Sequence, residues 1–538
     1  MNNLQANICL LAVTLCWSCE VIIFSVIPDG VNPFATTCVT SLIGAAIMGA
    51  CFARRIAEAF RRDRWLLARR VALLSIMNTS YNVLILMGLD YFDVSTGAFT
   101  LSMTVVVLPV LLIVMRRGVG VRTWASAGCV LAGIAVAVSP SFLMPQLPGL
   151  VLMLVSCAIR ALYIVKLNDY AREHEPIALA AGISGINSVI AFVPWCAMQP
   201  TTFAALPWST ELIAAYVIHA YFIVGFATVL NIFAQRRATA AQATIIYSTE
   251  IVFSIIWACF LPAPIVDPVV LSAPIVVGCA LIVVGNLLEI VPFGRRDTGT
   301  ATQGGASAEI DAAEIDAARI DATGIDTAGR KLGDPSTEVV HGGNSSGQEV
   351  AGVSGVLGVL RKPLAQKVAL FVVLLGVYLV LALPLKVLSV IPGFTDIRPV
   401  ELLQPVYGIF FGLPGCFAFA VGNLIGDIVS DGLRWSSIAG FVANFAYPCL
   451  MYLFWCKLRK KPFDLRDGRT IGLMVLTMIV FAVIQAIIIA PSVALLYPDV
   501  DIALFVTSVV SNGSAFPVFF AIPLMILMQE ELGFKPLE

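Results

Sequence analysis

The segment Glu309-Ile-Asp-Ala-Ala-Glu-Ile-Asp-Ala-Ala-Arg-Ile-Asp-Ala-Thr-Gly-Ile-Asp-Thr-Ala328 repeats a five-residue unit that does not belong in a membrane. It lies in a longer stretch, Gly294 to Leu370, that contains no Phe, Trp, Tyr or Cys. Such a composition buries too little apolar surface to offset the entropy lost on ordering. We therefore predict a disordered linker over residues 294–366, with a membrane module on each side of it.

The rest of the chain is strongly apolar. Of its 538 residues 59% are hydrophobic and 12% are charged, whereas soluble proteins carry roughly 25% charged residues. Apolar runs recur at about 20 residues, the length that crosses a hydrocarbon core. We predict an all-α polytopic membrane protein and expect no nucleic-acid partner. The first run lacks a basic leader and a small-residue cleavage site, so we expect a first membrane helix and not a cleaved signal.

The first module, residues 1–293, divides into two halves, 1–140 and 147–293, of five apolar segments each. We place the ten segments at about 4–27, 32–53, 68–89, 93–115, 122–139, 148–167, 177–198, 211–235, 239–260 and 268–290. Five helices per half give the halves opposite orientations, which is the inverted-repeat plan of many transporters. Gly128-Cys-Val-Leu131 and Gly278-Cys-Ala-Leu281 occupy the fifth segment of each half and agree with such a repeat.

Basic residues fall in every second loop of this module. They are Arg54, Arg55, Arg61, Arg62, Arg64, Arg69, Arg70, Arg116, Arg117, Arg122, Lys166, Arg172, Arg236, Arg237, Arg295 and Arg296. The intervening loops contain no Lys or Arg, and their charged residues are Asp29, Asp90, Asp93, Glu211 and Asp267. The positive-inside rule therefore predicts a cell-membrane protein with both ends of this module in the cytoplasm.

The module resembles EamA-type members of the drug/metabolite transporter superfamily over roughly residues 5–292. The residues that carry the resemblance are Trp17-Ser18, the Thr-x-x-x-x-Pro109 run, both Gly-Cys-x-Leu motifs, and the Gln235-Arg-Arg-Ala-Thr-Ala-Ala-Gln-Ala segment that leads toward Glu250. The resemblance implies ten helices around a central cavity and the transport of small organic metabolites.

The second module, residues 367–538, has six apolar segments. They lie at about 367–390, 399–411, 414–430, 436–456, 470–490 and 502–528. Basic residues before the first segment and between the fourth and fifth predict that both ends of the module are cytoplasmic. The linker would then be cytoplasmic at both of its ends.

The stretch from Arg398 to Gly415, with Gly422-Asn-Leu-Ile-Gly426-Asp427, resembles the S-components of energy-coupling-factor importers, including queuosine-precursor-type members. The resemblance covers roughly residues 365–530 and implies capture of a vitamin or similar micronutrient, with a membrane coupler protein and ATPases supplied in trans. The chain contains no Gly-x-x-x-x-Gly-Lys-Ser/Thr loop, so it does not itself supply ATP hydrolysis.

Charges inside a bilayer are costly and mark functional positions. Glu20 and Arg160 lie in the first helices of the two halves, at depths that differ by roughly 10 Å. We expect both to line one cavity in which Arg160 neutralises an anionic substrate; the alternative is that Arg160 reaches back to the cytoplasmic surface. Glu250 lies near mid-membrane, where an unpaired carboxyl suits proton coupling; a neutral, hydrogen-bonded structural role is its alternative.

Polar side chains of the other helices complete the candidate cavity. They serve either the cavity or helix packing, which polar groups also stabilise. The candidates are Asn78, Tyr81, Asn82, Tyr163 and His219.

In the second module the candidate ligand-binding residues are Arg398, Glu401, Gln404, Asn423, Asp427 and Asn512. Ala418, Gly422 and Gly426 form a row of small residues suited to close helix packing, either within the module or against another subunit.

An enzyme is not expected. Gly182-Ile-Ser184-Gly185 matches a motif of intramembrane proteases, but Ser184 and His219 should differ in depth by roughly 12 Å. No His, Cys, Asp or Glu cluster has the spacing of metal ligands, so we expect neither metal nor cofactor. We predict a carrier of a small organic metabolite fused to a micronutrient-binding module. The alternatives are the capture subunit of an ATP-driven importer and a sensor or scaffold without transport.

Overall fold

The computed structural model describes residues 1–24, 27–28, 31–89, 91, 102–138, 147–199, 202–260, 272–290, 364–387, 398–430 and 433–537. Within these ranges every regular element is a helix. Eleven helical stretches there are long and apolar enough to cross a membrane, and three shorter apolar helices accompany them. The prediction of an all-α polytopic membrane protein is confirmed. The predicted linker lies outside the described residues except for its last three, which begin a helix.

Each of the ten segments predicted for the first module contains a helix. The helices are α1 (Asn3–Ser18), α2 (Glu20–Phe24), α3 (Pro33–Arg62), α4 (Arg64–Leu89), α6 (Thr104–Val114), α7 (Val121–Val138), α8 (Leu147–Glu173), α9 (Pro176–Met198), η2 (Thr202–Ala205), α10 (Thr210–His219), η3 (Ala220–Ala227), α11 (Thr228–Gln235), α12 (Ala240–Tyr247), α13 (Thr249–Phe260) and α14 (Ala273–Ile290).

Polar caps fix where several of these helices begin. Asn2 and Gln5 form a reciprocal capping box at α1, and the Thr239 hydroxyl accepts a hydrogen bond from the Gln242 main-chain N–H at α12. Such caps satisfy backbone donors that lack a partner in the first turn. The α3 helix begins with proline at its first position, where the missing N–H costs nothing.

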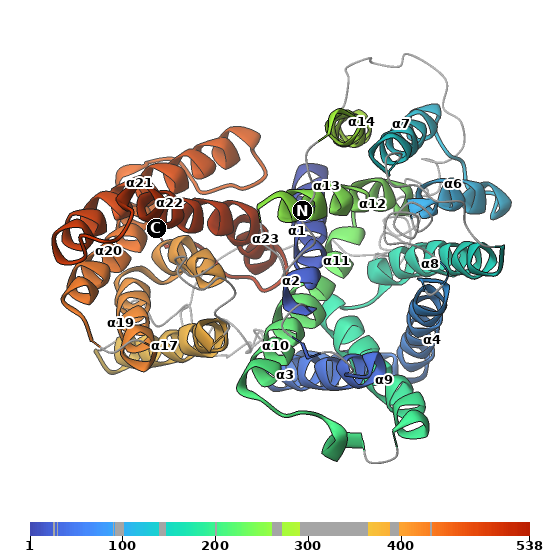
Figure 1. Cartoon of the computed structure of the whole chain (residues 1–538), viewed down its shortest axis with the longest axis horizontal. Helices are drawn as coiled ribbons and strands as arrows, with labels where there is room; N and C mark the ends of the chain where they lie inside the picture. Colours follow the sequence, from blue (N-terminus) through green and yellow to red (C-terminus); the bar gives the residue numbers. More distant parts are fainter. Residues whose placement is uncertain are drawn as a thin grey trace, which may run out of the picture.

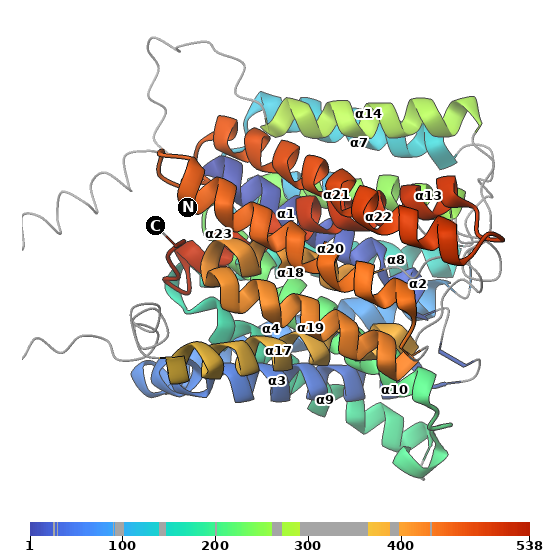
Figure 2. The ribbon, with the colours of Figure 1, turned by 90° about the vertical axis from the view of Figure 1, so that its left-hand side faces the viewer.

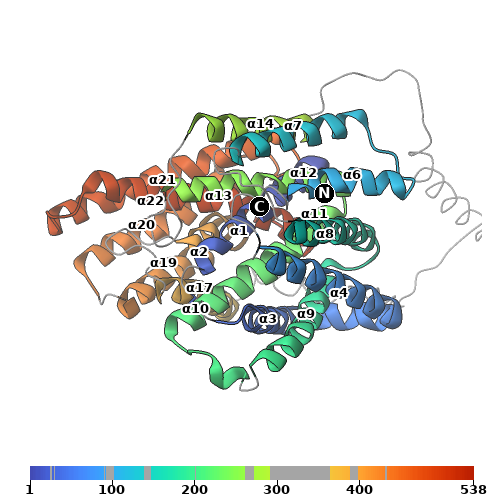
Figure 3. The same cartoon turned by 45° about the vertical axis from the view of Figure 1, so that its right-hand side comes forward.

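The packing of the helices follows a two-fold pattern. The second helices of the halves pack together (α3 on α9), and so do the fifth (α7 on α14). The contact of α4 with α8 is matched by that of α11 with α1, and the contact of α6 with α8 by that of α12 and α13 with α1. The α3–α9 and α7–α14 pairs, each made of equivalent helices of the two halves, lie at opposite edges of the module. The helices α1, α8, α11 and α13 lie between them (Figures 1 and 3). An inverted repeat predicts this set of contacts.

The two Gly-Cys-x-Leu motifs meet at the α7–α14 contact. A Cβ on Gly278 would lie 2.5 Å from the carbonyl oxygen of Gly133, so only glycine permits this approach. The Cys129 thiol donates a hydrogen bond of 3.3 Å to the Leu281 carbonyl. The motif therefore packs one half of the module onto the other.

The second module follows its predicted segments closely. Its helices are α17 (Leu364–Val387), η5 (Pro399–Leu402), α18 (Leu403–Val406), η6 (Tyr407–Phe411), α19 (Gly412–Ser430), α20 (Trp435–Tyr452), η7 (Leu453–Leu458), α21 (Gly468–Leu496), α22 (Ile502–Phe516), η8 (Pro517–Ala521) and α23 (Ile522–Glu530).

The chain reverses direction at Gly412, between η6 and α19. Gly412 has φ 58° and ψ −140°, a conformation that favours glycine. A Cβ on Gly415 would lie 2.4 Å from the Tyr407 carbonyl oxygen, whereas residues eight apart in one helix are about 12 Å apart. Residues 399–411 are therefore a short segment of their own, folded back against α19.

The two modules pack side by side (Figure 1). Phe222 lies against Phe520 and Phe253 against Phe519, with ring centroids 6.3 and 6.5 Å apart. The Tyr221 hydroxyl donates a 3.1 Å hydrogen bond to the Leu381 carbonyl. The two modules thus contact each other directly, which the prediction of a disordered linker between them did not indicate. The physical reason is that η3 and α13 present aromatic side chains that η8 covers.

Candidate functional site

Three helices in the first module are interrupted, each next to a titratable residue. The first membrane segment breaks at Cys19, and Glu20 begins α2. The α10 helix ends at His219 and continues as the π-helix η3. The ninth segment breaks at Ser248, two residues before Glu250. Interrupted helices and π-turns expose backbone groups and recur at functional sites.

Glu20 and His219 lie together at two of these breaks. His219 Nε2 is 3.5 Å from Glu20 Oε1. The sequence placed both residues in one cavity but did not pair them. The break at Cys19, between α1 and α2, accompanies this pairing and was not predicted.

Arg160 lies thirteen residues from each end of α8. It has no ion pair within 4 Å among the residues that the structure describes. Its guanidinium is within electrostatic range of Glu250, Tyr81 and Tyr247 in the interior of the module. These neighbours favour a position in the interior of the module over a side chain that reaches back to the surface.

Aromatic side chains surround the charged groups. The Tyr81 and Tyr163 rings lie 5.7 Å apart, and Trp17 lies 5.0 Å from Tyr247. The Ser156 hydroxyl donates to the Tyr81 carbonyl at 2.9 Å and joins α8 to α4.

Asn78 and Asn82 are placed differently from these aromatic residues. The Asn82 amide donates to the Asn78 carbonyl within α4 at 2.9 Å, and Asn82 is exposed. Among the described residues, neither side chain hydrogen-bonds to Glu20, Arg160 or Glu250.

A buried amide–phenol network supports the site and was not predicted. Tyr247 donates its hydroxyl hydrogen to Asn231 Oδ1. Gln235 donates to the Tyr247 hydroxyl at 2.8 Å and to Asn231 at 3.1 Å. Asn231 and Gln235 are four residues apart in an apolar helix, and this spacing was the available signal.

Two hydrogen bonds tie α13, which carries Glu250, to α1. Thr14 and Thr249 share a 3.0 Å hydrogen bond between their hydroxyls. The Trp257 indole donates to the Ser18 hydroxyl at 2.9 Å. The helices next to the breaks at Cys19 and Ser248, α1 and α13, are therefore packed against each other.

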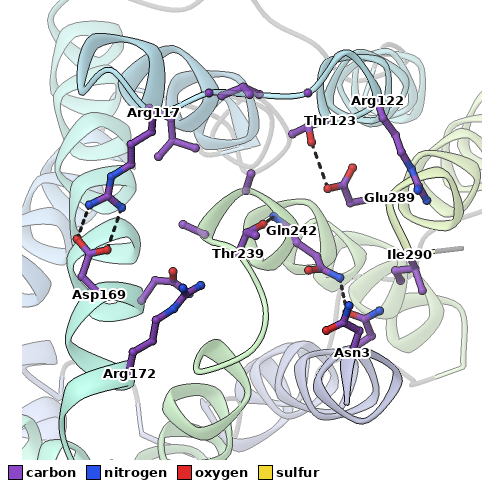
Figure 4. A pocket seen from close by; sticks show the side chains of 18 of the residues that line it. Asn3, Arg117, Arg122, Thr123, Asp169, Arg172, Thr239, Gln242, Glu289 and Ile290 are labelled. Atoms are coloured by element: carbon purple, nitrogen blue, oxygen red, sulfur yellow. Dashed lines mark hydrogen bonds and ion pairs between the residues drawn. The ribbon is translucent and has the colours of Figure 1, made fainter. Parts of the chain in front are cut away.

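A cavity of about 860 Å³ opens at the end of the module where the basic loops gather (Figure 4). Arg117 forms a two-pronged ion pair with Asp169, both bonds 2.8 Å long. Gln242 donates to Asn7 at 2.7 Å across the cavity wall. Arg172 also lines the cavity, whereas Arg160, Glu20 and Glu250 are not among its described lining residues. The sequence did not predict this cavity.

The second module contains a more deeply buried polar centre. Glu401 and Gln404 are 4% and 0% exposed, and the Gln404 amide donates to the Glu401 carboxylate. The Arg398 main-chain N–H donates to Asn512 Oδ1 at 2.9 Å. Asn423 donates to Asp427 one turn along α19, at 3.4 Å. The Arg398–Asn512 hydrogen bond thus joins two of the predicted segments, whereas Asn423 and Asp427 hydrogen-bond to each other within α19.

Two further residues of this centre were not predicted. Gln485 of α21 donates to Asn444 of α20 at 3.0 Å, and both are at most 3% exposed. Gln485 is also within hydrogen-bond range of Glu401. The Oε1 atoms of Gln404 and Gln485 are buried and have no hydrogen-bond donor among the described residues. Asn444 and Gln485 are both strongly polar residues in apolar helices, which is the same kind of signal that made Glu250 a candidate.

The small-residue row of α19 packs within its own module. A Cβ on Gly422 would lie 2.3 Å from the Tyr378 ring of α17, and Ala418 is fully buried. Gly426 is also buried. No group of three or more His, Cys, Asp or Glu residues in the described parts of the chain is placed to hold a metal ion.

Comparison with known protein families finds a match for one region of the chain. Residues 4–139 match the EamA-like transporter family. A solved structure described as "Crystal structure of protein" is 19% identical, with a TM-score of 0.45, and the match covers 54% of this chain and 98% of that chain. No curated protein matches. The chain is therefore a multi-pass membrane protein whose first half-module, residues 4–139, is related to the EamA-like transporters.

Proposed function

We propose that the first module is a secondary carrier of a small organic anion and that proton movement drives it. The observation that carries the proposal is the arrangement around Arg160, which lies near Glu250 in the module interior while Glu20 pairs with His219. A cation without an ion pair among the described residues is suited to bind a carboxylate or similar anion.

Glu250 and Glu20 supply the proton-binding groups of the proposed cycle. Glu250 lies within range of both Arg160 and Glu20, so an anion bound at Arg160 changes the balance of charge that Glu250 experiences. A proton on Glu250 would free Arg160 for the substrate, and loss of that proton would restore the attraction between Glu250 and Arg160. This exchange couples one proton to one anion.

The basic loops indicate the orientation of the carrier. Arg55, Arg117, Arg172 and Arg236 gather at the end of the module that carries the 860 Å³ cavity. We propose that this end is cytoplasmic, as the positive-inside rule predicts, and that the cavity is the vestibule on that side.

The test is transport by the full chain in liposomes. A panel of small carboxylates is offered with and without an imposed pH gradient, and uptake is compared between the wild-type protein and Arg160→Gln. The proposal predicts gradient-dependent uptake of at least one carboxylate, reduced to background in the variant. Uptake that is equal in both proteins would contradict the proposal.

The buried polar centre of the second module supports a second candidate function, ligand capture. Gln404 Oε1 and Gln485 Oε1 lack donors among the described residues, and Glu401 lies beside both side chains. Three acceptors in one buried region favour a polar ligand that carries N–H or O–H donors. Whether a coupler protein and ATPases act with it is tested by co-purification of the full chain from its native membrane.

A further inference from the structure

Two adjacent glutamates at the end of α23 lie at the boundary between the modules. Glu530 and Glu531 belong to the second module, but most of their charged partners belong to the first. The N-terminus and the C-terminus lie at this same end of the molecule (Figure 2).

Glu531 joins three parts of the first module. Its carboxylate is 3.0 Å from Arg55 Nη2 of α3 and 2.7 Å from Arg236 Nη1, just after α11. Arg236 also donates to the carbonyl oxygens of Ala171 and His174, at 3.0 and 2.9 Å, where α8 ends. The side chains of Glu531, Arg55 and Arg236 are 8%, 30% and 31% exposed, so these contacts are largely shielded from water.

Glu530 holds the beginning of α1 in a similar way. It accepts two hydrogen bonds from Arg466, at 2.9 and 3.0 Å, and lies 2.7 Å from the amino group of Met1. The Asn2 side chain donates to the Arg466 carbonyl at 2.8 Å. Arg466 belongs to the loop between η7 and α21, so this contact joins α1 to two parts of the second module.

The helices that the glutamates hold are those that carry the candidate site. Glu20 follows α1, Arg160 is on α8, and Asn231, which orients Tyr247, is on α11. Alternating access needs the ends of such helices to move relative to each other. Breaking a largely buried ion pair is costly because it leaves a charge without its partner.

We propose that Glu530 and Glu531 form a lock through which the second module holds the first in the conformation described. Release of the lock requires α23 to move, so a conformational change in the second module controls the carrier. The lock is separate from the attachment between the modules, which rests on the aromatic contacts of Phe519 and Phe520 and on the Tyr221–Leu381 hydrogen bond.

The test is hydrogen–deuterium exchange of the full chain in lipid nanodiscs. For Glu531→Gln we expect about tenfold faster exchange in peptides covering residues 53–62 and 236–242, and for Glu530→Gln in the peptide covering residues 1–10, because each segment end loses its ion pair with the substituted glutamate. Arg55→Gln should speed exchange in the peptide covering residues 53–62, and there the double variant of Glu531→Gln and Arg55→Gln should exceed neither single variant by much, since both remove the Arg55–Glu531 pair.

Glu173→Gln is the matched control. Glu173 pairs with Arg70 inside the first module at the same end of the molecule, so this variant should change exchange near residues 64–73 and leave peptides 1–10 and 236–242 unchanged. If Glu531→Gln does not fold, Arg55→Gln and Glu530→Gln serve instead. Unchanged exchange at 1–10 in folded Glu530→Gln, or at 53–62 in folded Glu531→Gln or Arg55→Gln, would overturn the proposal.

A second measurement separates the lock from the attachment. A protease site inserted between residues 330 and 331 allows the linker to be cut in the purified protein. We expect the two fragments to remain together in wild type and in Glu531→Gln. Separation of the glutamine variant alone would make the pair an attachment and overturn its role as a lock. That the lock controls transport rests on the proposed carrier function. Neither measurement needs a substrate, so the lock and the carrier function can fail independently of each other.

Discussion

The polar centres of the two modules differ in how their charges are compensated. In the first module, Glu20, His219 and Glu250 lie at helix breaks, and Arg160 has no ion pair among the described residues. In the second, Glu401, Gln404, Asn444 and Gln485 are at most 4% exposed and hydrogen-bond mainly to each other. The first arrangement suits groups that change charge and partner during a cycle. The second suits fixed recognition of a ligand's donors.

The largest effect is expected at Glu250. In Glu250→Gln the amide keeps the shape of the side chain but cannot bind or release a proton at neutral pH. Transport should lose its dependence on an imposed pH gradient while binding of the anion remains. The measurement is gradient-driven uptake into liposomes, and unchanged gradient dependence would exclude Glu250 from coupling.

In the second module, substitution of the buried carboxylate Glu401 should affect the stability of the protein. Glu401→Ala leaves the buried Gln404 amide without its acceptor, which should destabilise the protein by about 1–3 kcal/mol. Glu401→Gln restores an acceptor and should cost less. Thermal unfolding in detergent measures both. An equal effect of the two substitutions would mean that the carboxylate itself, and not the presence of an acceptor for Gln404, matters at this position.

A comparable loss of stability is expected from a substitution at the contact between α19 and α17. Gly422→Ala places a methyl group 2.3 Å from the Tyr378 ring, and overpacking of this kind costs about 1–3 kcal/mol. Gly376→Ala on α17 is the matched control, because a Cβ there has nothing within 4 Å. Equal melting temperatures for the two variants would show that α17 shifts to accommodate the added methyl group without a measurable loss of stability.

The smallest effect concerns the cap of α21. The backbone N–H of Arg469 holds the pKa of the Asp467 carboxyl below its ordinary value of 3.8. A lowered carboxyl pKa adds stability above the ordinary value, and this contribution is lost as pH falls through the folded-state pKa. Asp467→Asn should keep the cap but lower the melting temperature slightly at pH 7 and not at acid pH. A difference that is independent of pH would contradict this assignment.

The sequence was sufficient to predict the helices and their order. Apolar length located all sixteen segments, and the Gly-Cys-x-Leu motifs indicated an inverted repeat. Charged residues in apolar runs also made Glu20, Arg160 and Glu250 candidates for the site. Each of these signals is local in the chain, so no knowledge of packing was needed.

What the sequence did not predict depends on contacts between distant segments. The pairing of Glu20 with His219 needs the break at Cys19, and the Asn444–Gln485 hydrogen bond needs α20 beside α21. The packing of the modules on each other was missed for the same reason. A long polar linker indicates only that two modules can separate, whereas Phe519 and Phe520 determine that they do not.

The most direct test of the central claim, that Arg160 binds the transported anion, is a thermal-shift screen of the purified full chain. Small carboxylates, including amino acids and acidic vitamins, are offered to wild type, Arg160→Gln and Arg398→Gln. We predict that at least one carboxylate raises the melting temperature of wild type and of Arg398→Gln but not of Arg160→Gln. A carboxylate that stabilises Arg160→Gln as much as wild type would contradict the account.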